Sequence, residues 1–127
     1  PVSQWFHDAK FGIFIHWGPS CVPGYRTDWY PRWMYLDTFQ CNHITGEVTS
    51  DQPHKAYLYH VKTYGDPAEF GYKEFFPLFK AEAFDAKAWV DLFARSGAKY
   101  VIPVAEHHDS YAMYDSTITR WNCPEIT

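Results

Sequence analysis

The sequence has few cysteines, no excess of basic residues and no long apolar run, and each shortage excludes a class of protein. The three cysteines, Cys21, Cys41 and Cys123, lack any CxxC or CxxH spacing. Neither a zinc site nor a redox motif is therefore indicated, and their odd number leaves the redox compartment open. Scattered Lys and Arg residues and a net charge of −4 argue against a nucleic-acid partner. No apolar run is long enough for a membrane span, and residues 1–10 do not form a signal peptide. We therefore expect a soluble chain, from which a leader could have been removed.

Aromatic residues, in contrast, are abundant. They make up 20% of the 127 residues, and 46% of the chain is hydrophobic, which is enough to bury one modest core. The charged fraction of 20% is ordinary for a folded protein, and no repeat or low-complexity segment marks a second domain. The composition thus predicts at most one domain, whose aromatic side chains fill a core or line a ligand cleft.

Two apolar runs each end in histidine. Residues 11–17 are rich in β-forming residues without strict alternation, as expected for a strand buried on both faces, and this run contains His16. Residues 99–105 form the second predicted strand, which His107 and His108 follow. Because active sites of parallel barrels form at the carboxyl ends of the strands, we predict an α/β fold that is part of a (β/α)8-like barrel.

The clearest helix signal lies between these strands. Residues 86–96 place apolar side chains on one face, with Asp85 as the N-cap and Gly97 just beyond the end. This helix leads into the second strand and completes a β-crossover-β unit, in which Pro103 predicts a bulge or mispairing. Weaker patterns predict a lead-in turn over 5–10, a loop over 19–25, short helices from Asp28, over 56–63 and over 72–79, and a long loop or partly helical excursion over 37–56.

The strand ends collect side chains that suit a polyol ligand. Convergence of strand ends brings His16, Trp17 and residues 106–109 within reach of a common ligand. Both His107 and His108 face it only if the chain turns there, which Asp109-Ser110 favours. A neutral imidazole offers one donor and one acceptor, which matches a vicinal diol, and tryptophan adds an apolar wall with one N–H.

A series of motifs runs from Trp5 to Asn122: WF, AKFGIFIHWG, DWYPR, KTYG, GAKY, HHD, DS and WN. Their order and spacing resemble the N-terminal part of the α-L-fucosidases of glycoside hydrolase family 29. The resemblance is weakest over residues 37–56.

This resemblance implies an incomplete (β/α)8-like barrel, with residues 1–127 as a single partial catalytic domain of a retaining enzyme that removes terminal α-L-fucose from glycoconjugates or oligosaccharides. The aspartate nucleophile and the acid/base lie beyond Thr127, so the fragment alone is expected to be inactive. We expect no cofactor and no metal, and the charge and the lack of a long apolar run predict no nucleic-acid or membrane partner. The motifs imply substrate-binding roles for His16, Asp28, Trp29, His107 and His108, with Trp17 and Tyr111 as secondary candidates.

Three residues depart from the family pattern. Asp28 stands where the family commonly has Glu, so it keeps an acceptor on a shorter arm. Ser110 and Tyr111 replace Gly and Phe. Tyr111 retains an aromatic wall, whereas Ser110 is strained if its position requires a positive φ.

The residues also leave two other classes of protein open. One is a metal-dependent barrel hydrolase with His16, His107, His108 and Asp109 as ligands, and the other is a non-catalytic fucose-binding fragment. For the remaining polar residues we expect structural roles: Asp109 bonds nearby backbone or orients an imidazole, Glu106 joins an interior polar layer, and His43, His54 and His60 are surface or structural residues.

Overall fold

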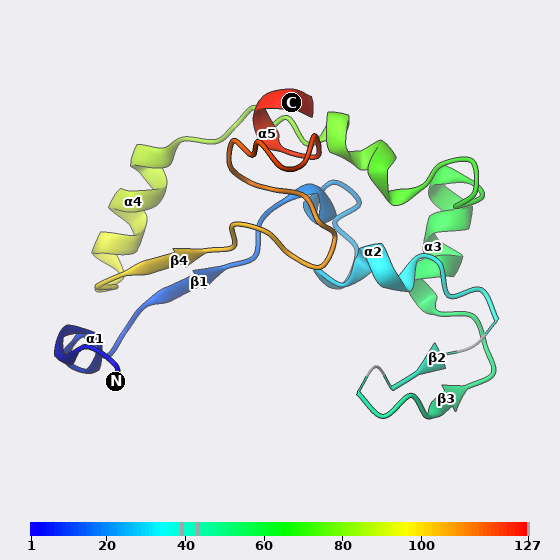
Figure 1. The fold of residues 1–127 in the computed structure, drawn as a ribbon, viewed down its shortest axis with the longest axis horizontal. Helices are drawn as coiled ribbons and strands as arrows, with labels where there is room; N and C mark the ends of the chain where they lie inside the picture. The colour runs from blue at the N-terminus through cyan, green and yellow to red at the C-terminus, as the bar shows by residue number, and fades with distance from the viewer. Residues whose placement is uncertain (39, 43, 127) are drawn as a thin grey trace.

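The computed structural model describes residues 1–38, 40–42 and 44–126, and the strands in this part form two small sheets. Strand β1 (Ile13–Ile15) pairs in parallel with β4 (Val101–Pro103), and β2 (Gln40–Cys41) pairs antiparallel with β3 (Val48–Ser50) (Figure 1). The helices are α1 (Gln4–Ala9), α2 (Tyr30–Trp33), α3 (Lys55–Tyr64), α4 (Ala86–Arg95) and α5 (Cys123–Ile126), with 3-10 helices η1 (Pro19–Cys21) and η2 (Tyr72–Leu78). The fold is α/β, as predicted, and none of the described helices is both long and apolar enough to cross a membrane.

The parallel pair β1–β4 brings the two histidine-bearing strand ends to the same edge. Ile13 lies opposite Val101 and Ile15 lies opposite Pro103 in an unbroken register. The predicted bulge or mispairing at Pro103 is therefore wrong. The amide of Val104 donates to the Ile15 carbonyl at 3.0 Å, so the nitrogen of the preceding residue, Pro103, points away from β1 and no ladder bond is lost.

The prediction that residues 11–17 form a strand buried on both faces is wrong for the described chain, and the second strand, expected to be buried as well, is exposed. Every residue of β4 is exposed, and Phe14 in the middle of β1 is 65% exposed. In the described residues each strand has one strand neighbour, and α4 lies on one side of the pair (Figure 1). The strands therefore carry more apolar side chains than this part of the chain buries.

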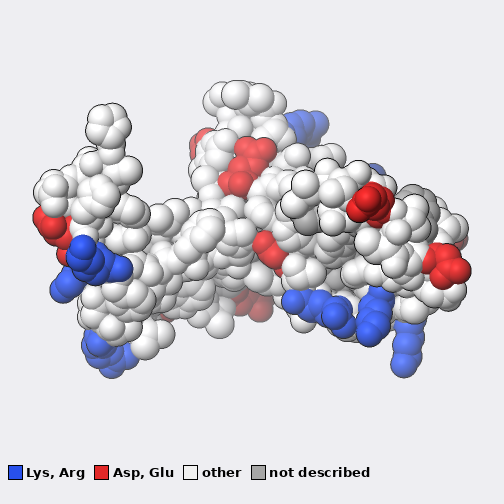
Figure 2. Space-filling view, turned by 90° about the horizontal axis from the view of Figure 1, so that it is seen from below, with Lys and Arg blue, Asp and Glu red and all other residues white. Residues whose placement is uncertain are grey.

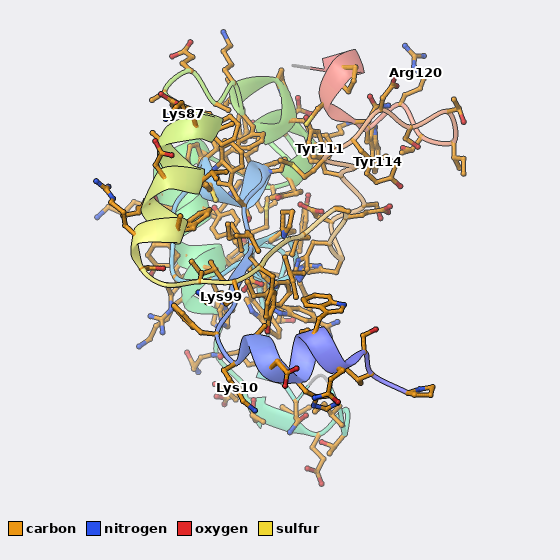
Figure 3. All side chains as sticks on the ribbon, turned by 90° about the vertical axis from the view of Figure 1, so that its left-hand side faces the viewer. Lys10, Lys87, Lys99, Tyr111, Tyr114 and Arg120 are labelled. Carbon is orange, nitrogen blue, oxygen red and sulfur yellow. The ribbon has the colours of Figure 1, made fainter. Side chains whose placement is uncertain are left out.

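The core instead lies among α2, α3 and η2 and is mostly aromatic. Its fully or nearly buried members are Tyr30, Met34, Ala56, Tyr72, Phe75, Phe76, Phe79 and Tyr111. Figure 3 places Tyr111 and Tyr114 on the segment after β4, Lys87 in the first turn of α4, and Lys99 between α4 and β4. Because Tyr111 joins the core, the segment that carries the paired histidines is anchored to the helical part of the molecule.

Helix α4 confirms the strongest helix prediction. The Asp85 carboxylate accepts from the Ala88 amide at 2.9 Å, as an N-cap does, and Gly97 adopts φ 88° just beyond the end. Helix α3 agrees with the prediction over 56–63 and ends before Gly65.

Three weaker predictions need correction. The lead-in turn is the helix α1, and the segment 72–79 is a 3-10 helix that contains Pro77. The predicted loop or partly helical excursion over 37–56 contains the β2–β3 hairpin, in which the Asn42 amide donates to the Glu47 carbonyl at 2.8 Å. Local hydrogen bonds, such as that from the Ile44 amide to Asn42 Oδ1 at 2.9 Å, stabilise the loop of this hairpin. Bonds of this kind leave no periodic pattern of apolar residues in the sequence, so the hairpin was not predicted.

Candidate functional site

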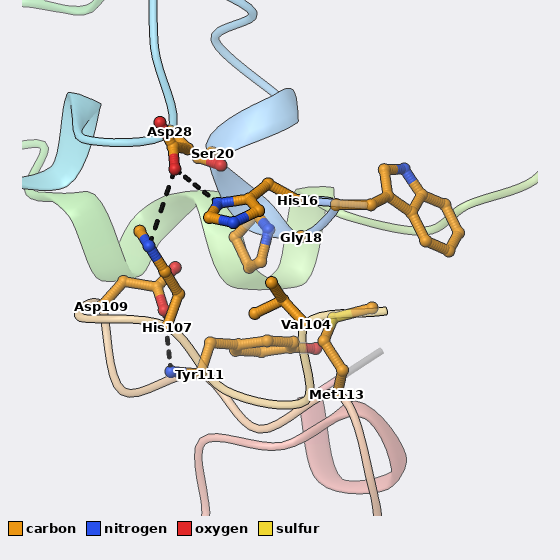
Figure 4. Close-up of a pocket in the computed structure, with 11 residues that line it drawn as sticks. His16, Gly18, Ser20, Asp28, Val104, His107, Asp109, Tyr111 and Met113 are labelled. Atoms are coloured by element: carbon orange, nitrogen blue, oxygen red, sulfur yellow. Dashed lines mark hydrogen bonds and ion pairs between the residues drawn. The ribbon is translucent and has the colours of Figure 1, made fainter. Parts of the chain in front are cut away.

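The five residues predicted to bind substrate lie together where β1 and β4 end. Asp28 is at the centre of the group, and Figure 4 shows His16 and His107 directed at its carboxylate. His16 Nδ1 is 2.5 Å from Asp28 Oδ2, and His107 Nε2 is 3.6 Å from the same oxygen. The rings of His16 and His107 meet edge to face with centroids 4.9 Å apart. Two strands and the loop before α2 thus supply one polar cluster.

Asp28 is held ionised by its neighbours. Partial burial acts to raise the pKa of Asp28, but hydrogen bonds from Thr27 and His16 and the charge of His16 outweigh it, and the pKa is lowered. Thr27 Oγ1 donates to Asp28 Oδ1 at 2.9 Å and accepts from the Trp29 amide at 3.2 Å. Sequence inspection missed Thr27. A Thr directly before the acid at a helix start was the available signal.

Trp29 and His108 form the second part of the site. Their rings stack with centroids 4.4 Å apart and planes 19° apart. His108 Nε2 lies 3.3 Å from the Asp28 carbonyl oxygen, which can only accept, so the Nε2–H donates. The stack therefore places an apolar ring surface and the second ring nitrogen of His108, Nδ1, at the site.

A turn lets both neighbouring histidines reach the site. The Ser110 amide donates to the His107 carbonyl at 3.0 Å, and Ser110 has φ 60°. The predicted turn is confirmed, as is the positive φ that strains a serine at this position. Burial is the main cause that lowers the pKa of His107, and the charge of His108 adds to it, so the His107 imidazole is neutral near pH 7.

Two cavities adjoin these side chains. The cavity bounded by His16, Asp28, His107 and the aromatic wall of Tyr111 has a volume of about 20 Å³, which is room for one water molecule. An open groove of about 880 Å³ is lined by Trp29, His108 and residues of α2 and η2. The small cavity is therefore too small for a sugar, whereas the groove beside Trp29 and His108 has room for one.

The two secondary candidates mainly pack. The ring of Trp17 contacts those of Phe84 and Trp89, with centroids 4.8 and 5.2 Å away, and Trp17 also lines the small cavity. Tyr111 is 1% exposed, and its ring lies 4.8 Å from that of Phe76. Both residues support the floor of the site.

The structure also places the remaining polar candidates. Asp109 Oδ1 accepts from the Tyr111 amide at 3.2 Å, which confirms the predicted bond to nearby backbone. Glu106 is exposed and 3.4 Å from the Tyr114 hydroxyl, so its predicted place in an interior polar layer is wrong, because the chain leaves β4 after Pro103. His54 caps α3 through Nδ1 and His60 is buried in the core, both structural roles as predicted. His43 lies outside the described residues.

Within the described chain, one group of side chains has the spacing of a metal site. His16, Asp28 and His107 each offer a ligand atom, and these atoms lie within 4.8 Å of one another. Two imidazoles and one carboxylate suit zinc or copper. His108 and Asp109, which the metal alternative included, are not in this group.

On the face shown in Figure 2, Lys and Arg lie in separate groups and share the surface with Asp and Glu, so the described residues of this face form no continuous basic patch.

Comparison with known proteins connects this arrangement to a family. A family model described as Alpha-L-fucosidase matches residues 1–127. The chain is 35% identical over 127 residues to the tissue alpha-L-fucosidase of Rattus norvegicus, covering 99% of this chain and 24% of that protein. It is 36% identical over 122 residues to the plasma alpha-L-fucosidase of Homo sapiens, covering 95% of this chain and 23% of that protein. The chain therefore spans about a quarter of the length of these relatives.

Solved structures agree. The Thermotoga maritima alpha-fucosidase in complex with a mechanism based inhibitor superposes with a TM-score of 0.79 at 38% identity, covering 98% of this chain and 28% of that one. The same enzyme in complex with fucose gives a TM-score of 0.74 at 39% identity, with the same coverage. The fold and site are those of an α/β protein that gathers histidines at the ends of parallel strands. The chain belongs to the alpha-L-fucosidase family, as its motifs indicated.

Proposed function

We propose that the polypeptide containing this chain hydrolyses terminal α-L-fucose from glycoconjugates or oligosaccharides with retention of configuration. In this proposal residues 1–127 form the first units of a (β/α)8-like barrel, a single partial catalytic domain that holds the sugar. The observation that carries the proposal is the meeting of His16, Asp28, Trp29, His107 and His108 in a chain of this family.

The histidine nitrogens of the cluster match sugar hydroxyls. His16 donates its Nδ1–H to Asp28, which leaves Nε2 for a sugar hydroxyl. His108 uses Nε2 for the Asp28 carbonyl and has Nδ1 as its second polar atom, and neutral His107 offers one donor and one acceptor. The stacked Trp29 and His108 rings supply the apolar face that the C–H groups of a pyranose require.

Asp28 is suited to binding and not to nucleophilic attack. Its two carboxylate oxygens already accept from Thr27 and His16, which lowers the pKa of Asp28 and reduces its nucleophilicity. A retaining glycosidase needs a nucleophile and an acid/base about 5 Å apart. We place both beyond Thr127, in the part of the polypeptide that completes the barrel.

The test is hydrolysis of an aryl α-L-fucoside by the full-length polypeptide and by the 127-residue chain. We expect turnover by the first and none by the second. Replacing His16 or His108 by Ala removes neutral hydrogen bonds of about 0.5–1.5 kcal/mol and lowers kcat/KM roughly twofold to tenfold. His7→Ala, at an exposed histidine of α1, is the matched control. Unchanged kinetics in both site variants would remove these histidines from the site.

A fucose-binding fragment is the second candidate, because all five binding residues lie within a quarter of the relatives' length. Saturable fucose binding by a full-length polypeptide that does not turn over the aryl fucoside supports this alternative. Turnover by the full-length polypeptide excludes it.

A further inference from the structure

We propose that Tyr72 is a positioning residue for the sugar-binding histidines, acting through the carboxylate of Asp109; this inference rests on the proposed function. Tyr72 is the first residue of η2 and lies 37 positions before Asp109 in the chain. No motif in the sequence relates the two residues. The structure brings them together with the Tyr72 hydroxyl donating to Asp109 Oδ2 at 2.8 Å.

The turn over residues 107–110 needs external support. It reverses the chain so that adjacent histidines both face Asp28 and Trp29, and it places Ser110 at φ 60°. A non-glycine residue adopts this left-handed conformation only at a steric cost. Such backbone conformations persist where the surrounding structure holds them in place.

Asp109 provides that support on two sides. One carboxylate oxygen, Oδ1, accepts from the Tyr111 amide at 3.2 Å and so spans Ser110 from within the turn. The other oxygen, Oδ2, accepts from Tyr72, which belongs to a different element. The internal bond shapes the turn, and the external bond fixes where the turn sits.

Tyr72 is itself held rigidly. Its side chain belongs to the aromatic core, with ring centroids 5.6 Å from Phe76 and 5.9 Å from Phe75. Its amide donates to the Tyr35 hydroxyl at 2.8 Å. Burial, followed by the charge of Asp109, raises the pKa of Tyr72, so the phenol remains a donor throughout the neutral range. A buried ring on the core thus fixes a carboxylate directly beside the paired histidines.

The experiment is a double-mutant cycle in the full-length polypeptide, with KM, kcat and the inhibition constant for free fucose as readouts. Tyr72→Phe removes one hydroxyl and keeps the ring. We expect KM and the fucose inhibition constant to rise roughly tenfold, because the loss of one hydrogen bond to a carboxylate corresponds to a factor of about ten. We expect kcat to change less than threefold, roughly, because the reacting carboxylates lie elsewhere. In the Asp109→Ala background the same Tyr72→Phe change should alter KM by less than about twofold.

Tyr114→Phe is the matched control, because Tyr114 also donates to a carboxylate, that of Glu106 at 3.4 Å, but lies outside the sugar site. A purely structural role for Tyr72 would lower the yield of folded enzyme and leave KM at the wild-type value. Unchanged KM in Tyr72→Phe, or equal effects of this change in both Asp109 backgrounds, overturns the inference.

The proposed function fails separately, if the wild-type polypeptide neither binds fucose nor cleaves the aryl fucoside. In that case crystal structures of the wild type and Tyr72→Phe decide the inference. A displaced turn over residues 107–110 in the variant supports it, and an unchanged turn overturns it.

Discussion

Asp28→Asn is the change that most directly tests the centre of the site. Asn keeps the size of the side chain and one acceptor oxygen but removes the charge that the hydrogen bond from His16 Nδ1, at 2.5 Å, depends on. Exchanging a charge-assisted hydrogen bond for a neutral one costs about 1–1.5 kcal/mol. The Asp28 side chain is 30% exposed, so solvent screens part of this interaction and we expect a loss of about 1 kcal/mol.

This loss predicts roughly fivefold weaker inhibition by free fucose and a similar rise in KM for an aryl α-L-fucoside. The assay is steady-state hydrolysis by the full-length polypeptide, with fucose as the competing ligand. The physical reason is that His16 loses the partner that fixes its tautomer and ring orientation, so Nε2 no longer points to one hydroxyl.

Two variants make the test decisive. Asp91→Asn breaks a contact of similar length, 2.6 Å to Lys87 on the exposed face of α4, and should leave both constants unchanged. Asp28→Glu keeps the charge and should bind fucose at least as well as Asp28→Asn. If Asp28→Asn and Asp91→Asn both behave as the wild type, the reasoning about the His16–Asp28 pair is refuted.

Three further predictions concern stability and metals. Ser110→Gly relieves the φ of 60° and should raise the free energy of unfolding by about 0.5–1 kcal/mol; an unchanged or lower urea midpoint contradicts this. Burial lowers the pKa of His60, so the unfolded chain binds the extra proton and stability should fall as the pH drops below about 6.5; urea midpoints at acidic and neutral pH measure this, and His60→Gln should flatten the dependence. A chelator should leave fucosidase activity intact, whereas added Zn²⁺ should inhibit competitively at His16, Asp28 and His107; inhibition that persists in His107→Ala, or loss of activity on chelation, contradicts this.

Sequence inspection located the helices and strands where local chemistry determines them. Asp85 and Gly97 bound α4 because an N-cap carboxylate and a left-handed glycine act within one turn of their own position. The β2–β3 hairpin and the exposure of β4 escaped prediction for opposite reasons. The hairpin strands are too short for a periodic pattern, and apolar strand residues indicate burial only where neighbouring chain covers them.

The same division applies to the site. Order and spacing of motifs identified the family, and the histidines at the strand ends predicted a polar cluster, because parallel strands that carry them must meet at one edge. Sequence order did not show that His108 donates to the Asp28 carbonyl 80 residues away, or that Tyr72 reaches Asp109. Those contacts depend on where an aromatic core packs two distant segments, and packing is a property of the assembled chain. The sequence alone thus determined the family and the residue types of the site, whereas the tertiary structure decided their partners, their tautomers and the turn that aims them.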